Sequence, residues 1–151
     1  MAIMTFRAES TLKGGLSVES TAGKFTVLMD EPETLRGTDT GMNPVEMLLC
    51  SLGACQCIVA RLFAKARKID LEDFRVELEG DLDTDGFLRG QEGVRPGLKE
   101  IRYTMHIKTS VPMEQAEHFA AFIKARCPVS DVIINGTSLI QKDIQVTPKT
   151  A

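Results

Sequence analysis

Residues 43–68, NPVEMLLCSLGACQCIVARLFAKARK, decide the fold because they predict one long helix. Asn43 is a favourable N-cap, Pro44 suits the first helical position, and Glu46 stands where its side chain can return to the cap amide. Two start signals therefore agree on where the helix begins.

The middle of this predicted helix is apolar on nearly every side. From position 47 to position 60, only Ser51 and Gln56 are plainly polar. Basic residues arrive in the last turns, where they complement the negative end of the helix dipole. A helix of this kind is expected inside a core or a subunit interface.

The whole chain predicts a single domain, residues 1–151, with a hydrophobic fraction of 43% and a formal net charge of −3. It has no uninterrupted stretch of roughly 18 apolar residues and no signal-peptide pattern, so we expect a cytoplasmic protein without a membrane partner. The acidic balance, the single tyrosine and the lack of a basic run argue against a nucleic-acid partner.

Alternating apolar and polar residues predict strands before and after the helix. Residues 4–11, 16–21 and 24–29 are separated by breaks that contain glycine, which predicts an antiparallel meander with one buried face. Residues 74–82 and 101–107 alternate in the same way and predict two half-buried strands.

The last third of the chain combines helices with a strand. An amphipathic helix is predicted over residues 112–126, and Cys127 and Pro128 then begin a short helical stretch. A final strand is predicted at residues 139–147. The order of elements indicates the α+β class.

An acidic segment, residues 81–92, has the spacing D-x-D-x-D-G-x5-E of a calcium-binding EF-hand loop. The matching positions are Asp81, Asp83, Asp85, Gly86 and Glu92. An EF-hand needs a helix on each side, whereas here a strand enters and two glycines and a proline follow. We therefore interpret the segment as an acidic hairpin loop, with structural calcium as the alternative.

The cysteines carry the candidate chemistry, and they are Cys50, Cys55, Cys57 and Cys127. They lack the paired spacing that zinc sites use, so we expect no metal. His106 and His118 both fall on polar faces, which argues against a Cys–His protease arrangement. Thiol redox chemistry remains.

Three cysteines lie within the central helix. Cys50 and Cys57 share a face about 10 Å apart, too far to bridge, and we interpret them as small buried hydrophobic residues. Cys55 points elsewhere and follows Gly53 and Ala54, two small residues that let another backbone or a small ligand approach.

Cys127 differs because it precedes Pro128 at the predicted start of a helix. As an N-cap it would lie at the positive end of the helix dipole, which favours the thiolate. Local electrostatics therefore indicate Cys127 as the more reactive thiol.

Two motifs together, NPVEMLLCSLGAC and, some seventy residues later, ARCPVSDVI, resemble the superfamily of osmotically inducible protein C (OsmC) and organic hydroperoxide resistance (Ohr) proteins. The likeness extends over essentially the whole chain. It implies an OsmC-like α+β fold, with antiparallel sheets wrapped around two main helices, and an interwoven homodimer.

The resemblance also implies an activity and the residues for it. By likeness to the family, Cys55 attacks an organic hydroperoxide and Cys127 resolves the product as a disulfide, which an external dithiol reduces without a bound cofactor. Arg36, in the loop before the helix, stands close to the family arginine that holds the thiolate. From the residues alone, the alternative interpretation is that Arg36 is a solvent-exposed loop arginine without a role at the thiol.

One position departs from the family pattern. Peroxidase members carry a glutamate directly after the Asn-Pro pair, where this chain has Val45. The neighbouring Glu46 lies on the opposite helix face from Cys55, so we interpret it as a cap residue. A non-enzymatic dimer that senses redox state or binds a small ligand therefore stays open as the alternative function.

Overall fold

The predicted central helix is present as α1 (Pro44–Phe63) in the computed structural model, which describes residues 3–148. Asn43 Oδ1 accepts the backbone N–H of Glu46, and the Glu46 carboxylate accepts the backbone N–H of Asn43, both at 2.9 Å. This reciprocal capping box confirms the predicted start of the helix.

The end of α1 comes earlier than predicted. After Phe63 the chain tightens into the 3-10 turn η2 (Lys65–Arg67), and Lys68 adopts a left-handed φ of 57° that ends the helical path. Arg61 donates a hydrogen bond of 2.8 Å to the carbonyl oxygen of Leu71, which ties the last turn of α1 to the segment leading into the next strand.

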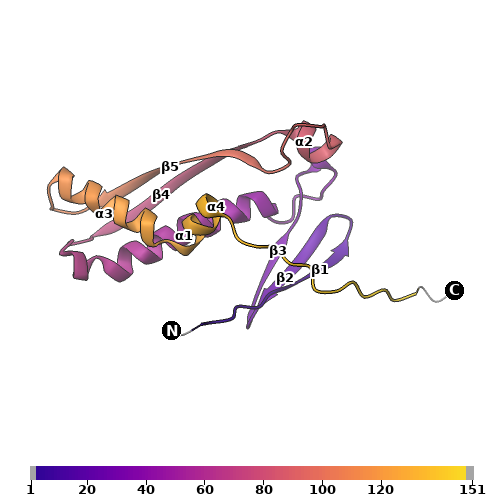
Figure 1. Ribbon diagram of the computed structural model, residues 1–151, viewed down its shortest axis with the longest axis horizontal. Coiled ribbons are helices and arrows are strands. Elements are labelled where there is room, and N and C mark those ends of the chain that lie inside the picture. Colours follow the sequence, from indigo (N-terminus) through magenta and orange to yellow (C-terminus); the bar gives the residue numbers. More distant parts are fainter. Residues whose placement is uncertain (1–2, 149–151) are drawn as a thin grey trace.

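The strands form two separate antiparallel sheets. The first is a meander of β1 (Glu9–Gly14), β2 (Ser17–Ala22) and β3 (Phe25–Met29). The second is a long hairpin of β4 (Asp73–Leu82) and β5 (Leu98–Lys108), and Figure 1 shows α1 running beneath it. The predicted α+β class with antiparallel sheets is confirmed.

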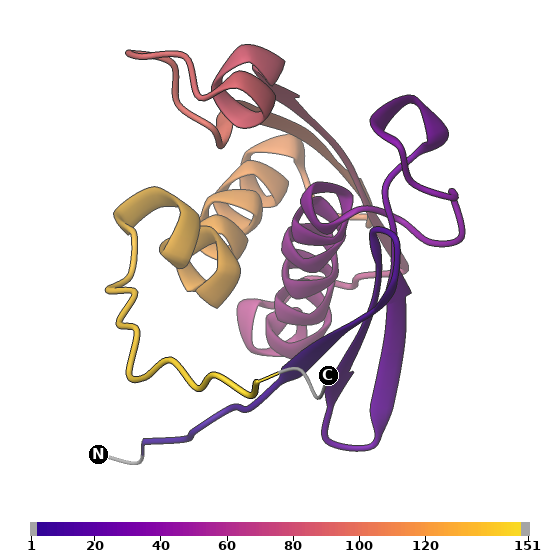
Figure 2. The ribbon, with the colours of Figure 1, turned by 90° about the vertical axis from the view of Figure 1, so that its right-hand side faces the viewer.

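Three further helices complete the described part of the chain. The short α2 (Thr84–Arg89) lies at the tip of the β4–β5 hairpin, inside the acidic segment, where the sequence predicts only a loop. The two others are α3 (Met113–Arg126) and α4 (Pro128–Asn135). Both lie beside α1 on the same face of the hairpin (Figure 2).

The core lies where α1, the β4–β5 hairpin and the α3–α4 pair meet. Its fully or nearly buried apolar residues are Leu52, Val59, Ala60, Ala64, Ile69, Leu71, Phe119, Ile123 and Cys127. Phe63 and Phe122 close one end of it with an edge-to-face contact, their ring centroids 5.3 Å apart. One cysteine, Cys127, thus belongs to the core itself.

The meander differs from its prediction in two ways. Its first strand begins at Glu9 rather than at position 4. Its apolar face is not buried in the single chain, since Phe25 is 68% exposed and Val27 40% exposed. The three strands pair with one another while the helices pack on the other sheet, so the Phe25 end of this face is left uncovered by residues 3–148.

The predicted last strand at residues 139–147 is wrong for the single chain. This segment forms no strand and runs away from the core as an extended arm (Figure 1). Its large apolar residues are Leu139, Ile140, Ile144 and Val146, all at least 72% exposed. A strand needs a neighbour for its backbone hydrogen bonds, and the part of the chain that the structure describes offers none here.

By length and composition alone, α1 would also qualify as a membrane-spanning helix. Core helices of globular proteins pass the same test, because burial in a core and burial in lipid both select apolar residues. In this fold α1 packs against β4, α3 and α4.

Candidate active site

Cys55 is held at the middle of α1. Its side chain is half-buried and packs against the core cluster that contains Cys127. The glycine two positions earlier serves a different purpose from the one the sequence suggests. A Cβ on Gly53 would lie 2.8 Å from Cδ1 of Leu78, so Gly53 lets α1 approach strand β4 rather than opening space for a ligand at the thiol.

Cys127 is the single residue that joins α3 to α4. Its backbone N–H still bonds the carbonyl oxygen of Ile123, while its own carbonyl accepts the N–H of Asp131, both at 3.0 Å. The predicted N-cap role is confirmed, because Cys127 Sγ accepts the backbone N–H of Ser130 at 3.4 Å and Pro128 follows at the first helical position. The side chain is completely buried.

The fold brings Cys55 and Cys127 together as two free thiols in mutual contact. Burial raises the pKa of Cys55, the backbone N–H of Val129 opposes this, and the neighbouring Cys127 sulfur raises the pKa further. Burial also acts to raise the pKa of Cys127, but hydrogen bonds from Ser130, Cys55 and the backbone of α4 outweigh it and the net pKa is lowered. Cys127 is therefore the more acidic thiol, as its N-cap position predicts.

The two remaining cysteines do not join this pair. Cys50 is exposed on α1, so its predicted burial is wrong for the single chain. Cys57 is half-buried, and burial together with the charge of Asp73 raises its pKa. Of the three α1 cysteines, Cys55 is the one that packs against the core cluster that contains Cys127.

Arg36 lies at the end of the 3-10 turn η1 (Glu33–Leu35), in the loop between β3 and α1. Its backbone is left-handed, with φ of 70°, and its side chain is exposed. Among residues 3–148, no hydrogen bond or ion pair joins Arg36 to Cys55 or to Cys127. The single chain therefore does not bring the predicted arginine to the thiol pair.

The loop that carries Arg36 is nevertheless tightly held by a buried carboxylate, Asp30, which is 1% exposed. Asp30 accepts the backbone N–H of Glu31 and both the backbone N–H and the hydroxyl of Thr38 and of Thr40, at 2.5 to 3.3 Å. These bonds, led by that from the Thr38 hydroxyl, hold the pKa of Asp30 well below its usual range. A Cβ on Gly37 would lie 1.7 Å from the Glu31 carbonyl oxygen, so the loop also needs its glycine.

We expect Asp30→Asn to lower the melting temperature by several degrees near neutral pH, because an amide cannot accept all of these donors. The folded-state pKa of Asp30 is depressed, so its contribution is present above the unfolded-state pKa and is lost as pH falls. The difference between the two proteins should therefore shrink below about pH 4 in thermal melts. Asp39→Asn, in the same loop with an exposed side chain, is the control, and an equal loss in both variants would contradict the anchoring role.

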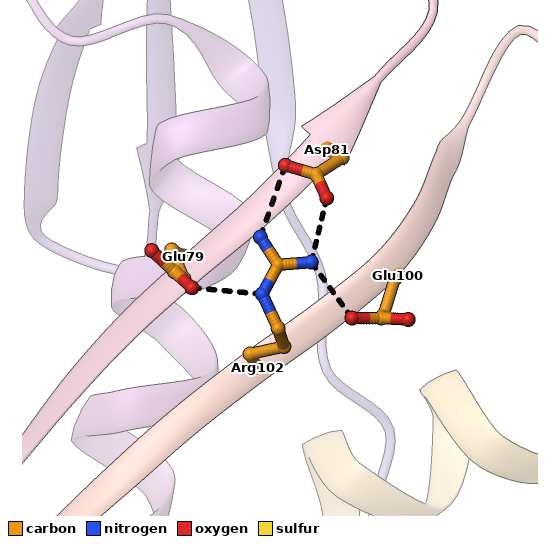
Figure 3. A network of polar contacts seen from close by, with 4 residues as sticks. All are labelled: Glu79, Asp81, Glu100 and Arg102. Atoms are coloured by element: carbon orange, nitrogen blue, oxygen red, sulfur yellow. Dashed lines mark hydrogen bonds and ion pairs between the residues drawn. The ribbon is translucent and has the colours of Figure 1, made fainter.

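The three aspartates of the acidic segment, Asp81, Asp83 and Asp85, are each engaged by a basic side chain. Arg102 of β5 holds three carboxylates at 2.6 to 3.0 Å (Figure 3), those of Glu79, Asp81 and Glu100. Asp83 caps α2 and pairs with Lys99 at 2.5 Å, while Asp85 pairs with Arg89 at 3.1 Å. Three of the four carboxylates that match the calcium spacing, all but that of Glu92, are thus neutralised separately.

This arrangement favours the hairpin interpretation of residues 81–92 over calcium. The hairpin is confirmed by the pairing of β4 with β5, and α2 occupies the place of the calcium loop. Within the described residues, no group of three or more His, Cys, Asp or Glu side chains has the geometry to hold a metal ion. His106 and His118 are both exposed, as their polar faces predict.

Comparison with known proteins identifies the architecture around the thiol pair. The sequence profile of the OsmC-like protein family matches residues 37–142. This span contains α1, the two hairpin strands β4 and β5, and both Cys55 and Cys127. The chain belongs to this family. The resemblance drawn from the two cysteine motifs is therefore confirmed.

The OsmC-like chain is also similar to two mycoplasma proteins named hydroperoxide reductase. The one from Mycoplasma genitalium is 26% identical over 141 residues, covering 91% of this chain and 92% of the relative. The one from Mycoplasma pneumoniae is 25% identical over 134 residues, covering 87% of each. The crystal structure of an OsmC like protein from Mycoplasma pneumoniae superposes with a TM-score of 0.77 at 23% identity, covering 86% of this chain and 87% of that one.

Two residues beside the OsmC-like thiol pair escape the sequence reasoning. Ser130 supplies the backbone N–H that Cys127 Sγ accepts. The signal that could have found it is its place three residues after the predicted N-cap, a usual donor position. Gln56 follows Cys55 in the chain and is completely buried. The sequence feature that could have identified it is a polar residue within an otherwise apolar run.

Proposed function

We propose that this OsmC-like protein is a thiol-dependent peroxidase that reduces organic hydroperoxides through Cys55 and Cys127. The observation that carries the proposal is the contact of two free thiols at the N-terminus of α4, where backbone N–H groups favour a thiolate. The names of the mycoplasma relatives support the same activity. We place the protein in the cytoplasm, where thiols are kept reduced, without nucleic-acid or membrane partners.

The proposed reaction has two chemical steps in the protein. The Cys55 sulfur attacks the distal oxygen of the hydroperoxide, the O–O bond breaks, the alcohol leaves and Cys55 becomes a sulfenic acid. The Cys127 thiolate then attacks the Cys55 sulfur, the sulfenic oxygen leaves as water after protonation, and a disulfide forms. An external dithiol reduces this disulfide, so the cycle needs no bound cofactor or metal.

We propose an interwoven homodimer as the functional unit. The uncovered meander face and the apolar arm of residues 139–147 support it, because contiguous exposed apolar surface of this kind marks an interface. Among residues 3–148 of one chain Arg36 makes no polar contact with the thiols, so its proposed role, stabilising the thiolate and the leaving alkoxide, requires the site to lie between two protomers.

Arg36→Ala should slow the alkylation of Cys55 near neutral pH by on the order of tenfold, because a nearby guanidinium favours the ionised thiol. The pH at which half of Cys55 reacts should rise, as measured by alkylation and peptide mass spectrometry. Arg95→Ala, a second exposed arginine, is the control. An unchanged alkylation profile would return Arg36 to the role of a solvated loop residue.

The alternative is a non-enzymatic dimer that senses redox state or binds a small ligand. This alternative is supported by the absence of the family glutamate, because its position holds Val45 here. The neighbouring Glu46 side chain is already engaged in the capping box. Glu46 therefore does not replace the missing carboxylate at the thiol.

Single-turnover kinetics separate the two functions. The peroxidase proposal predicts that one equivalent of an organic hydroperoxide is consumed as fast as thiols are lost, and faster than hydrogen peroxide. Slow thiol loss with no preference for the organic substrate would favour the non-enzymatic alternative.

A further inference from the structure

One side of α1 is open to solvent although it is apolar. Of the 18-residue stretch that makes the helix so apolar, only 28% is buried inside the chain. Ile58 and Leu62 are 65% and 69% exposed, and Leu48 is 41% exposed. Exposed apolar surface of this extent marks a place where another molecule binds.

The exposed residues gather on one side of the helix, because an α-helix turns about 100° per residue. The open face of α1, as we call it, consists of residues within about 80° of one another around the helix axis, namely Met47, Ser51, Ala54, Ile58 and Leu62. The buried residues of the helix, which include Leu52, Val59 and Ala60, lie on the other side. No charged residue occurs from position 47 to position 60, whereas a helix face that meets only water is normally charged or polar.

A second copy of the chain is the occupant that accounts for the most exposed apolar surface. The Phe25 end of the meander and the arm of residues 139–147 are also exposed, and the homodimer is already proposed to cover both. The same partner can cover the open face as well. Lipid fits poorly, because the opposite side of α1 packs against β4, α3 and α4 and the helix cannot be surrounded by a bilayer.

The open face is complementary to itself in size. Its central side chains, Ser51 and Ala54, are small, and the larger Met47 and Ile58 lie on either side of them. If a two-fold axis passes between residues 51 and 54, Ser51 meets the partner's Ala54 and Met47 meets the partner's Ile58. Small residues at the crossing let the helix axes approach to about 8 Å, and the larger pairs fill the space on both sides.

Charge selects the antiparallel orientation of the two helices. The acidic residue of α1, Glu46, is in its first turn, and the basic Arg61 is in its last turn, with Lys65 following in η2. Antiparallel copies bring the basic end of one helix near the acidic start of the other and oppose the two helix dipoles. Parallel copies would bring like charges together.

We propose that the open face of α1 packs antiparallel against the open face of a second copy, with the helices crossing at Ser51 and Ala54. The inference rests on the proposed homodimer and assigns the helix at its centre. Cys55 lies about 20° beyond Leu62 around the helix, at the edge of the open face, and is half-buried in the single chain. In this register the same edge of the partner's helix places the partner's Leu48 over Cys55, so the second chain completes the thiol site.

Cross-linking tests the register. Cys50→Ala, Cys55→Ser and Cys57→Ala leave the completely buried Cys127 as the one native thiol of the chain. Adding Ala54→Cys to this chain should give a covalent dimer of twice the mass on mild oxidation, because the two introduced thiols lie beside the two-fold axis. Ala125→Cys, at an exposed alanine of α3 in the same background, is the control and should stay a single chain.

Dissociation tests the same face in the chain with all four cysteines. Ala54→Arg should weaken the dimer about 100-fold or more in sedimentation measurements, because it buries an unpaired charge at the helix crossing. Ala125→Arg should leave the dimer unchanged. Both alanines are exposed in the single chain, so neither change disturbs its core.

The outcomes separate this inference from the proposals on which it builds. A dimer that neither cross-links through Ala54→Cys nor dissociates with Ala54→Arg would overturn the assignment of the open face and leave the homodimer standing. A wild-type chain that is monomeric at micromolar concentration, or that floats with phosphatidylcholine vesicles instead of dimerising, would overturn both. None of these readouts uses hydroperoxide, so the peroxidase proposal stands or falls separately.

Discussion

Cys55→Ser is expected to abolish fast reduction of organic hydroperoxides, a loss on the order of 10³-fold or more, because a serine hydroxyl is a far weaker nucleophile towards the peroxide oxygen than a thiolate. The measurement is hydroperoxide consumption in the presence of a dithiol reductant. The protein should stay folded, since the change keeps the size and the hydrogen-bonding capacity of the half-buried side chain.

Cys50→Ala and Cys57→Ala are the matched controls from the same helix. Both should leave the rate within a few fold, because neither thiol meets Cys127 in the fold. If Cys57→Ala lost activity while remaining folded, the assignment of Cys55 as the attacking thiol would be wrong.

The second large effect is expected at Cys127. Oxidation with one equivalent of hydroperoxide should give one intramolecular disulfide per chain between Cys55 and Cys127, which requires their Cα atoms to come within about 7 Å. Peptide mapping by mass spectrometry identifies the bridge. The contact between the two thiols in the reduced chain makes this the favoured pairing.

Cys127→Ser should leave the first turnover intact and stop the second. Without a resolving thiol, Cys55 remains a sulfenic acid and becomes prone to further oxidation to the sulfinic state. A bridge from Cys127 to Cys50 or Cys57 would contradict the geometry described above. The non-enzymatic alternative predicts no disulfide at one equivalent of oxidant.

The local signals of the sequence predict the elements that hold the site. The cap at Asn43 and the Cys127–Pro128 helix start are both present, because a cap depends on side chains within three residues of the helix end. The alternating runs predict β4 and β5 for a similar reason, since a half-buried strand repeats every two residues.

Two of the expectations that fail needed a distant partner. Residues 139–147 are rich in apolar side chains, but a strand also needs a neighbour, and residues 3–148 of the single chain provide none. Likewise Cys50 lies in an apolar run, yet its side chain is exposed, because no element within residues 3–148 covers it. The proposed homodimer would supply both missing partners.

The sequence by itself determined the class of the fold, the start of the central helix and the capping position of Cys127. These follow from interactions between residues close along the chain, whose outcome changes little with the rest of the molecule. From the residues alone the partner of Cys127 stayed open, and the resemblance implied Cys55. The tertiary structure shows Cys55 packed against the cluster that contains Cys127, and it alone decided that Gln56 reaches Ser130 across the interface of two helices. Such contacts join residues more than seventy positions apart, and their geometry depends on how α4 packs against α1, which no local pattern specifies.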